Sequence, residues 1–332
     1  MSYTHNFLFL VSDYMAQHTM GELKELDWIK TVNKSRLSQS RLKDFILRAL
    51  LSIKLNRYFS LPFKKAIYKS ILGTDFKESK PLCIVISPPW YNKHLIKYLR
   101  NEYKGCKIII NFHDTVKNSI ERNPLLSLDA IKSEFDCAVV YNPEDSKEYG
   151  FPLCHEGYTP IPVKELEVYP KCDVVFIGAA KDRLNIVRKL YRRFTDAGLN
   201  CFFYITEAPQ NERLDDGIIY ADKPMPFTEY LAREASANCL LEILQKGSTG
   251  KTYRMIEAII YNKKLITNCP EIKNSKYYNQ DYVIYFEDED AVSPEFIKMD
   301  VGEIDYKYSG DFSRKAFFEF IDDLMTDSKF IL

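Results

Sequence analysis

Short apolar runs recur along the chain, each bounded by turn-forming residues and followed by a stretch in which apolar residues recur at helical spacing. Strands that are apolar on both faces and separated by helices are typical of parallel sheets covered on both sides. The expected strands are residues 7–11, 82–86, 107–111 and 137–141, then 174–177, 201–205, 217–220, 239–244, 264–267 and 283–286. Helical spacing predicts helices at 93–103, 185–197, 227–237 and 253–261.

The chain has 332 residues, which is long for one domain and comfortable for two. Residues 159–172, TPIPVKELEVYPKC, interrupt the pattern with three prolines and indicate a linker. We therefore predict an α/β protein of two doubly wound Rossmann-like domains, residues 1–165 and 166–332, that face a cleft. The first contains a basic helical segment, 28–73, and the last helix, about 312–327, packs back on it. Ligands of such folds bind beyond the carboxyl ends of the strands, so the cleft is the expected site.

Acidic and basic residues number 46 each, so net charge indicates no partner, and we expect no nucleic acid. The eight cysteines are scattered without C-x-x-C pairs, which is typical of reduced thiols in a cytosolic protein. The run FLFLV is too short for a signal peptide, and no run approaches the roughly 20 apolar residues of a membrane span. We expect a cytoplasmic protein that acts at the cytoplasmic face of the inner membrane.

One stretch, GSTGKTYRMIEAIIYNKKLITN (247–268), resembles a phosphate-binding loop. The ATPase and GTPase pattern G-x-x-x-x-G-K-[ST] requires a glycine at position 245, where this chain has Gln245. The stretch can still bind an anion, because a glycine-rich turn that opens a helix presents backbone N–H groups and the positive end of the helix dipole.

Residues 30–69 are strongly basic, with Asp44 as the only acid, and contain an apolar stripe at helical spacing. The stripe consists of Leu42, Phe45, Ile46, Ala49, Leu50 and Ile53. We favour packing of the stripe on the domain's own sheet. Whether the basic face makes a peripheral contact with an anionic membrane or glycan stays open.

Several motifs carry a family resemblance. They are KIIINFHDTVKN (107–118), EFDCAVVYNPEDSKEYG (134–150), DVVFIGAAKDRL (173–184), TGKTYRMIEAIIYNKKLITN (249–268) and IKNSKYYNQDYVIYF (272–286). With two Rossmann-like halves, the chain resembles the GT-B class of glycosyltransferases. More narrowly, it resembles a bacterial lipopolysaccharide or capsule biosynthesis group related to spore-coat glycosyltransferase-like proteins. That family often has glutamine two residues before the glycine equivalent to Gly250, and this chain has Ser248 there.

The resemblance implies transfer of a sugar from a nucleotide donor without a required metal, so protein groups must neutralise the departing diphosphate. The loop 247–250, which includes Ser248, offers N–H donors, and Lys251, Thr252 and Arg254 follow it. Gly250, Arg254 and Glu257 share one helix face, and Glu257 is placed to accept hydrogen bonds from the ribose hydroxyls. The alternative is a surface ion pair between Arg254 and Glu257.

Four further residues complete the expected donor site. Gly178 ends the strand DVVFI and lets the backbone approach the diphosphate, with Lys181 and Arg183 within reach of the same anion. An ordinary strand–helix connection with solvated charges is the alternative. Glu242 ends a buried strand beside the loop, as a ligand of the donor sugar or as a structural acid.

The acceptor side should come from the first domain. His113 and Asp114 follow the strand KIIINF, and Asp13 follows the first strand. Each is a candidate general base if the reaction inverts the anomeric centre, and each is otherwise a helix cap.

We therefore expect a metal-independent glycosyltransferase of hexosyltransferase type, with a UDP- or GDP-sugar donor and no cofactor. Its acceptor would be a bacterial surface glycan, such as lipopolysaccharide, O-antigen or capsule, free or lipid-linked. A nucleotide- or sugar-binding protein without turnover is the second hypothesis, and a phosphate-loop NTPase is the third.

Overall fold

The computed structural model of the chain describes residues 3–12, 20–58, 63–73, 76, 79–155 and 157–327, without the side chains of residues 57 and 58. The chain forms two compact units, Met1–Thr159 together with Asp311–Leu332, and Pro160–Gly310. The change of unit falls at residue 160, where the sequence suggested residue 166. The chain returns to the first unit at residue 311.

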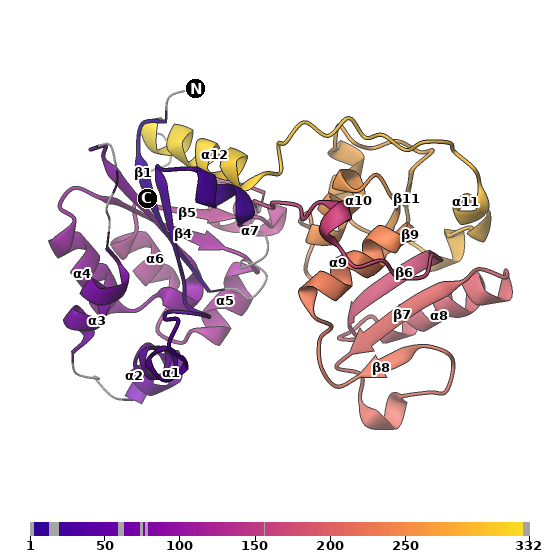
Figure 1. The fold of residues 1–332 in the computed structure, drawn as a ribbon, viewed down its shortest axis with the longest axis horizontal. Helices are drawn as coiled ribbons and strands as arrows, with labels where there is room; N and C mark the ends of the chain where they lie inside the picture. The colour runs from indigo at the N-terminus through magenta and orange to yellow at the C-terminus, as the bar shows by residue number, and fades with distance from the viewer. Residues whose placement is uncertain are drawn as a thin grey trace. The chain divides into compact units, whose positions relative to one another are not determined.

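The first unit is built on a five-stranded parallel sheet in the order β2-β1-β3-β4-β5 (Figure 1). The strands are β1 (Asn6–Val11), β2 (Ile29–Asn33), β3 (Leu82–Ile86), β4 (Lys107–Phe112) and β5 (Cys137–Val140). Phe7 pairs with Ile29 on one side and with Cys83 on the other. The strand order therefore reverses at β1, and the loops after β1 and β3 diverge there, which is the usual ligand position of a doubly wound sheet.

Helices cover both faces of this sheet. They are α1 (Arg41–Leu50), α2 (Ile53–Tyr58), α3 (Lys64–Ile71), α4 (Lys93–Glu102), α5 (Val116–Arg122), α6 (Leu128–Glu134), α7 (Pro143–Tyr149) and α12 (Arg314–Thr326). Successive strand residues point to opposite faces. Leu8 packs in the cluster that includes α3, α4 and α6, whereas Phe7 and Phe9 pack against Phe317 and Phe318 of α12.

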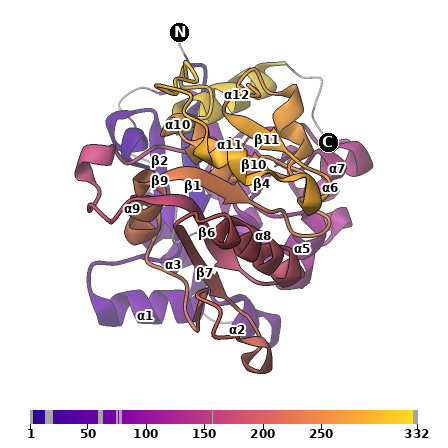
Figure 2. The same cartoon turned by 90° about the vertical axis from the view of Figure 1, so that its right-hand side faces the viewer.

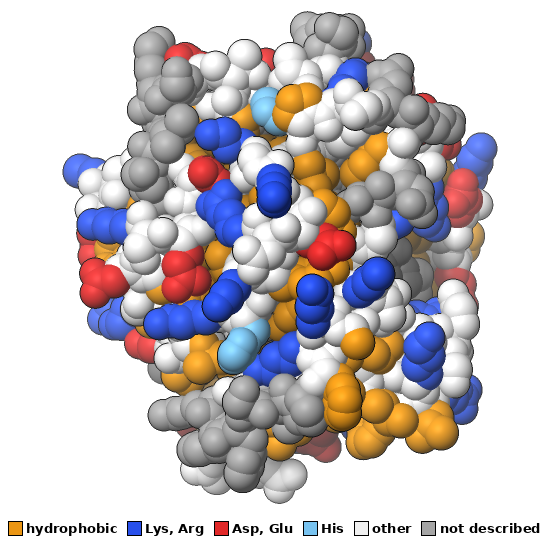
Figure 3. Space-filling view, turned by 90° about the vertical axis from the view of Figure 1, so that its left-hand side faces the viewer, with side chains coloured by type: hydrophobic (Ala, Val, Ile, Leu, Met, Phe, Trp, Pro, Cys, Tyr) orange, Lys and Arg blue, Asp and Glu red, His pale blue; other side chains and the backbone are white. Residues whose placement is uncertain are grey.

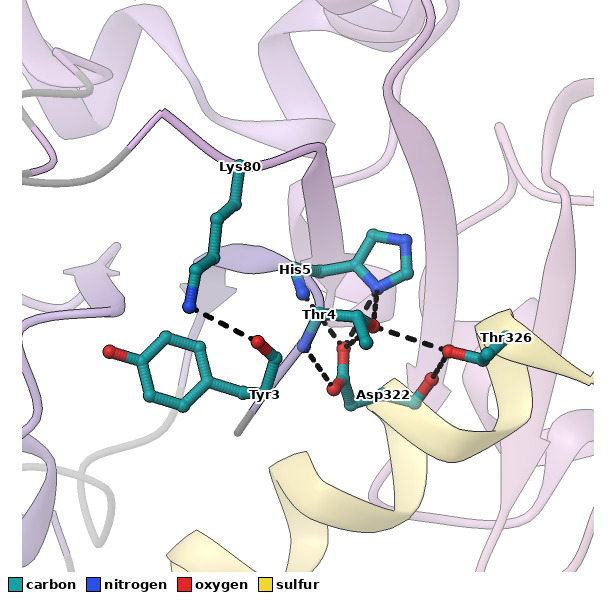
Figure 4. Close-up of polar contacts among 6 residues, drawn as sticks. All are labelled: Tyr3, Thr4, His5, Lys80, Asp322 and Thr326. Atoms are coloured by element: carbon teal, nitrogen blue, oxygen red, sulfur yellow. Dashed lines mark hydrogen bonds and ion pairs between the residues drawn. The ribbon is translucent and has the colours of Figure 1, made fainter. Parts of the chain in front are cut away.

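The last helix is also tied to the start of the chain by polar contacts (Figure 4). Asp322 accepts hydrogen bonds from the backbone N–H of Thr4 at 2.6 Å and of His5 at 3.0 Å. The Thr4 hydroxyl and the His5 Nδ1 lie 2.8 Å from its Oδ1. Burial alone would raise the pKa of Asp322, but these hydrogen bonds lower it overall. A buried carboxylate with this many donors fixes α12 beside β1.

The second unit has a six-stranded parallel sheet in the order β11-β10-β9-β6-β7-β8. The strands are β6 (Cys172–Ala179), β7 (Cys201–Thr206), β8 (Ile219–Ala221), β9 (Ala237–Glu242), β10 (Lys264–Thr267) and β11 (Val283–Tyr285), and the helices are α8 (Leu184–Asp196), α9 (Phe227–Ser236), α10 (Tyr253–Ile260) and α11 (Pro294–Lys298). Helix α8 lies beside β7 (Figure 2). Its residues Val187, Leu190 and Phe194 share one core cluster with Phe176 and Phe203. Helices α9 and α10 contact β6, β9 and β10.

Short 3₁₀ helices complete the two units: η2 (Gly21–Glu25), η3 (Pro88–Trp90), η4 (Val163–Glu165), η5 (Gln210–Glu212), η6 (Pro270–Asn274) and η7 (Glu289–Ala291). All eight cysteines are free thiols, and seven of them are buried. In the described part of the chain, no helix has the length and apolar character that a membrane crossing requires.

Each of the ten expected strands is present, and the structure adds β2. The helical assignment of 28–73 was wrong at its start, because Ile29–Asn33 is a strand. Among the described residues this edge strand pairs only with β1, and it is mostly half-buried, so polar residues interrupt the apolar pattern that marks the other strands. Its β-branched residues Ile29, Thr31 and Val32 favour the extended conformation.

The favoured packing of the apolar stripe on the sheet was wrong for its first three residues, whereas Leu50 packs against the core. Leu42, Phe45 and Ile46 of α1 are 70%, 65% and 47% exposed. The residues of α1 that are buried are Asp44 and Leu47, and Leu47 joins the core beneath the helix. Helical spacing established that α1 has an apolar face, but the core lies against the side of the helix that carries Leu47.

We expect Asp322→Asn to lower the free energy of unfolding at neutral pH by about 2 kcal/mol, because an amide cannot accept all of the hydrogen bonds to this buried carboxylate. The folded pKa lies below the usual value of 3.8, so this stabilisation is complete above that pH and is lost as the pH falls below it. Urea unfolding at neutral pH and near pH 3 checks both points. Asp323→Asn, at the exposed neighbouring position, is the control, and an equal effect of the two variants would contradict the role of Asp322.

Candidate functional site

The expected donor-site residues of the second unit gather at one edge of its sheet. The strand order reverses at β6, with β7 and β8 on one side and β9 to β11 on the other. Gly178 lies at the end of β6 and Glu242 at the end of β9, so both mark this reversal point. Loops that leave neighbouring parallel strands on opposite sides open a space for a ligand.

The loops after β6 and β9 are bonded to each other. The Asp182 carboxylate accepts a hydrogen bond from the backbone N–H of Lys246 at 2.9 Å. The Lys181 ammonium donates to the side-chain oxygen of Gln245. Lys181 adopts a positive φ of 44°, which turns the chain sharply after β6. These contacts hold two segments that are about sixty residues apart in sequence as one structural element.

Arg183 crosses between the two loops. Its guanidinium donates to the backbone oxygen of Ala179 at 3.1 Å and to that of Ile243, and it lies over the Phe176 ring. A Cβ atom at Gly178 would lie 3.1 Å from Arg183 Nη2, so a glycine leaves room for this side chain. Burial, with the nearby charge of Arg254, lowers the pKa of Arg183 to about 10. Among the described residues, Arg183 forms hydrogen bonds with carbonyl groups and no ion pair with a carboxylate.

Arg254, by contrast, forms a buried ion pair. Its Nε donates to Glu234 Oε1 at 2.9 Å, its Nη2 donates to the Ile177 carbonyl, and its side chain is only 11% exposed. Glu234 lies on α9 and is fully buried. Burial alone would lower the pKa of Arg254, but Tyr230 and the carboxylates of Glu234 and Glu257 raise it overall. Arg254 therefore stabilises the fold around the site by joining α10 to α9 and to β6.

Glu257 is fully buried as well. The Tyr230 hydroxyl donates to Glu257 Oε2 at 2.6 Å, and burial together with the nearby carboxylates raises the pKa of Tyr230 well above its usual range. The alternative of a surface ion pair between Arg254 and Glu257 was therefore wrong, since neither side chain lies on the surface. In the structure, the carboxylate of Glu257 accepts a hydrogen bond from the hydroxyl of Tyr230.

Glu242 is 2% exposed and accepts hydrogen bonds from the hydroxyls of Thr252 and Thr267. Burial raises the pKa of Glu242, although the two hydroxyls and the arginines Arg254 and Arg183 oppose the shift. Thr252 is the N-cap residue of α10, yet its side chain makes no capping hydrogen bond to the helix. The positive end of α10 is therefore not capped by that hydroxyl.

The glycine turn leads directly into this helix end. Gly247 has a φ of 83°, a conformation that L-residues with side chains rarely adopt, and it is followed by the half-buried Ser248. Gly250 is buried and Lys251 is half-buried beside it. The structure thus places Gly178, Lys181, Arg183, Glu242 and residues 248–257 at one edge of one sheet, which is rich in backbone N–H groups and cations.

The three acceptor-side candidates have different surroundings. In the first unit, His113 follows β4, and its Nε2 lies 3.0 Å from Ser87 Oγ and 3.3 Å from Asn111 Nδ2. Asp114 accepts from the backbone N–H of Thr115 at 2.8 Å and forms an ion pair with Arg122 at 2.7 Å. The N-cap residue of α5 is Thr115, whose hydroxyl accepts from the Asn118 backbone N–H at 3.2 Å, so Asp114 lies one residue before the cap. Asp13 lies outside the described residues.

Sequence reasoning missed Glu234 and Tyr230, which complete the buried charge cluster. One signal was present: Phe227, Leu231 and Glu234 recur at i, i+4 and i+7, so an acid lies on the apolar face of a helix. All three are buried. An acid at such a position needs a buried partner, but the spacing does not tell which arginine supplies it.

No family model matches the sequence, and no curated protein matches it either. Among solved structures, an alpha-glucosyltransferase in complex with UDP and a 13-mer DNA containing a central A:G mismatch is similar, with a TM-score of 0.55 and 13% identity over 97% of this chain and 99% of that chain. A UDP-N-acetylglucosamine 2-epimerase from Rickettsia bellii has a TM-score of 0.48 and 10% identity, with coverage of 98% and 97%. The glycotransferase of kitacinnamycin has a TM-score of 0.44 and 10% identity, with coverage of 98% and 99%.

At 13% identity, the similarity to the alpha-glucosyltransferase is one of fold. It extends over nearly the whole of both chains and therefore includes both parallel α/β units. The expected fold class, two Rossmann-like domains of GT-B type, is confirmed.

We expect Arg254→Met to lower the free energy of unfolding of the second unit by about 3 to 5 kcal/mol, because the carboxylate of Glu234 is left buried without its counter-charge. The double variant Arg254→Met with Glu234→Gln should recover part of this loss. Thermal unfolding followed by circular dichroism measures both. Glu229→Gln, which removes the half-buried i,i+4 partner of Arg233 on α9, is the control and should change stability by less than about 0.5 kcal/mol. Equal losses in the single and double variants would show that the two side chains are not coupled.

Proposed function

We propose that this protein is a glycosyltransferase that takes a sugar from a UDP- or GDP-sugar bound by the second unit. The observation that carries the proposal is the position of Arg183. Its half-buried guanidinium donates hydrogen bonds only to carbonyl groups within the described structure, beside a glycine turn and the N-terminus of α10. A partly buried cation of this kind is stabilised by an incoming anion, and a planar guanidinium suits a diphosphate.

The main requirement of the reaction is that the protein neutralises the negative charge of the departing diphosphate. Arg183, Lys181 and Lys251 supply three cations near the loops, and the glycine turn with the first turn of α10 supplies backbone N–H groups. Fixed donors of this kind stabilise developing negative charge without reorganisation. We therefore propose that transfer needs no metal ion, and that the buried Glu242 and Glu257 hold the sugar or ribose only after exchanging their present hydroxyl partners.

On the acceptor side we favour His113 over Asp114 as the general base. The Asn111 amide nitrogen is a donor, so the tautomer that it favours has its lone pair on His113 Nε2. A neutral imidazole in this state can accept the proton of an acceptor hydroxyl that replaces Asn111 and Ser87 at Nε2. The carboxylate of Asp114 is already held by Arg122 and by the start of α5.

The acceptor proposed here is a bacterial surface glycan, such as lipopolysaccharide, O-antigen or capsule, at the cytoplasmic face of the inner membrane. Support comes from α1, whose exposed Leu42, Phe45 and Ile46 are flanked by Arg41 and Lys43. Figure 3 shows hydrophobic side chains gathered at the lower right of one face, beside Lys and Arg side chains. A basic helix with an exposed apolar face is suited to an anionic membrane surface.

A binding protein without turnover is the second candidate, since Glu242 and Glu257 are both occupied in the structure. Donor hydrolysis measured across nucleotide sugars separates the two, because only an enzyme releases free sugar. The similar alpha-glucosyltransferase was solved with DNA, so duplex DNA belongs among the acceptors screened. An NTPase would instead require magnesium-dependent ATP binding.

We expect Arg183→Met to weaken UDP binding at least about tenfold, because a desolvated, charge-assisted contact to phosphate is lost. Isothermal titration with UDP, GDP and ATP, without and with magnesium, measures the effect. Arg192→Met, at an exposed position further along α8, is the matched control and should bind as the wild type does. Unchanged UDP affinity in Arg183→Met would overturn the donor site, and binding without hydrolysis or transfer would favour the second candidate.

The double variant Leu42→Ser with Phe45→Ser should reduce sedimentation with phosphatidylglycerol vesicles at least about tenfold, because each exposed side chain contributes more than about 1 kcal/mol when it enters the interface. Its thermal stability should stay unchanged, since both side chains are exposed. Val168→Ser, which alters a 91% exposed apolar residue of the second unit, is the control. Equal vesicle binding by all three proteins would contradict the membrane contact.

A further inference from the structure

The first unit contains a pocket of about 730 Å³, and none of the described residues that line it is among the expected site residues. It opens where three neighbouring strands end. Ser12 directly follows β1, Lys34 directly follows β2, and Pro89 belongs to η3, which follows β3. Its other side is formed by the junction of α1 and α2 and by the end of α5. The pocket therefore occupies the point at which the strand order of the first sheet reverses.

The charged residues that line this pocket are all basic in the described part of the chain. They are Lys34, Arg48, Lys54 and Arg122. Arg48 is paired with Asp44 at 2.9 Å and Arg122 with Asp114 at 2.7 Å, so carboxylates balance two of the four cations. Two positive charges, on Lys34 and Lys54, remain without a carboxylate partner among the described residues.

Lys34 is the most constrained of the four. Its ammonium donates to the backbone oxygen of Pro89 at 2.6 Å and lies 5.7 Å from the centroid of the Trp90 ring. Burial lowers the pKa of Lys34 to about 8. A carbonyl and an aromatic face offset only part of the cost of burying a full charge, so an anion in the pocket would stabilise the ammonium.

We propose that this pocket binds a phosphate group carried by the acceptor. Two unbalanced cations match the charge of a phosphomonoester, which is about −1.5 to −2 at neutral pH. The hydroxyl-bearing residues Ser12, Ser35 and Ser52 also line the pocket, and its volume accommodates a sugar together with its phosphate. That the ligand is an acceptor rests on the proposed function, whereas the anion site itself rests only on the pocket and its charges.

The test uses the full chain with UDP present at saturation, so that any phosphate site of the second unit is filled. The probe is glucose-6-phosphate, followed by phosphorus NMR and calorimetry, with glucose as the matched uncharged ligand. Lys54→Ala and Lys34→Met should each weaken binding of the probe about tenfold. Lys43→Ala removes the same charge from α1 at a position that does not line the pocket, and it should bind the probe as the wild type does.

The outcomes separate this proposal from the proposed function. Lys54→Ala should leave UDP binding unchanged, and Arg183→Met should leave binding of glucose-6-phosphate unchanged when UDP is raised to saturate the variant. An equal loss in Lys43→Ala and Lys54→Ala would overturn the pocket in favour of diffuse surface charge. Binding to phosphatidylglycerol vesicles without any binding of the soluble ester would overturn it in favour of a lipid surface.

Discussion

Parallel strand pairing determines where chemistry can occur in both units of this protein. Because all strands of each sheet run in one direction, every loop that follows a strand reaches the same edge. At the reversal points, β1 with β3 and β6 with β9, these loops diverge and leave space that side chains must line. In the second unit this space receives a glycine turn and the start of α10. In the first unit it receives Ser12, Lys34 and η3. The two candidate sites are thus consequences of one architecture applied twice.

Within the second unit, two arginines near the same Phe176 ring have opposite roles because their counter-charges differ. Arg254 meets the fully buried Glu234, so its charge is balanced inside the protein and the pair belongs to the structure. Arg183 donates to carbonyl oxygens and forms no ion pair with a carboxylate among the described residues, although Asp182, Glu242 and Glu207 lie near enough to raise its pKa. A partly desolvated charge without a paired counter-ion is stabilised by an anion that reaches it. The two arginines therefore differ because the carboxylate of Glu234 on α9 pairs with Arg254.

The sequence predicts most of the fold because ten of the eleven strands lie in short, mainly apolar runs, and such runs have few alternatives in a folded chain. It fails at β2, where an edge position tolerates polar residues. The site is predictable where it is local, as at Gly178 and the turn before α10, since glycines and cations there are adjacent in sequence. It is not predictable where it depends on contacts between distant elements. Periodicity places Arg254 and Glu257 on one helix face, but only packing shows that Glu234 and Tyr230 cover that face.

The segment from α1 to α2 contributes both to the cationic pocket and to the exposed apolar face of α1. Asp44 accepts hydrogen bonds from the backbone of Leu37 and Ser38 and pairs with Arg48, which directs that arginine toward the pocket. The opposite side of the helix leaves Leu42 and Phe45 in solvent. Exposure of large apolar side chains is unfavourable unless another surface covers them, and the desolvated ammonium of Lys34 is unfavourable unless an anion reaches it. Both costs are relieved together by an acceptor that carries a phosphate and is presented at a membrane, and neither is relieved by a neutral sugar in free solution.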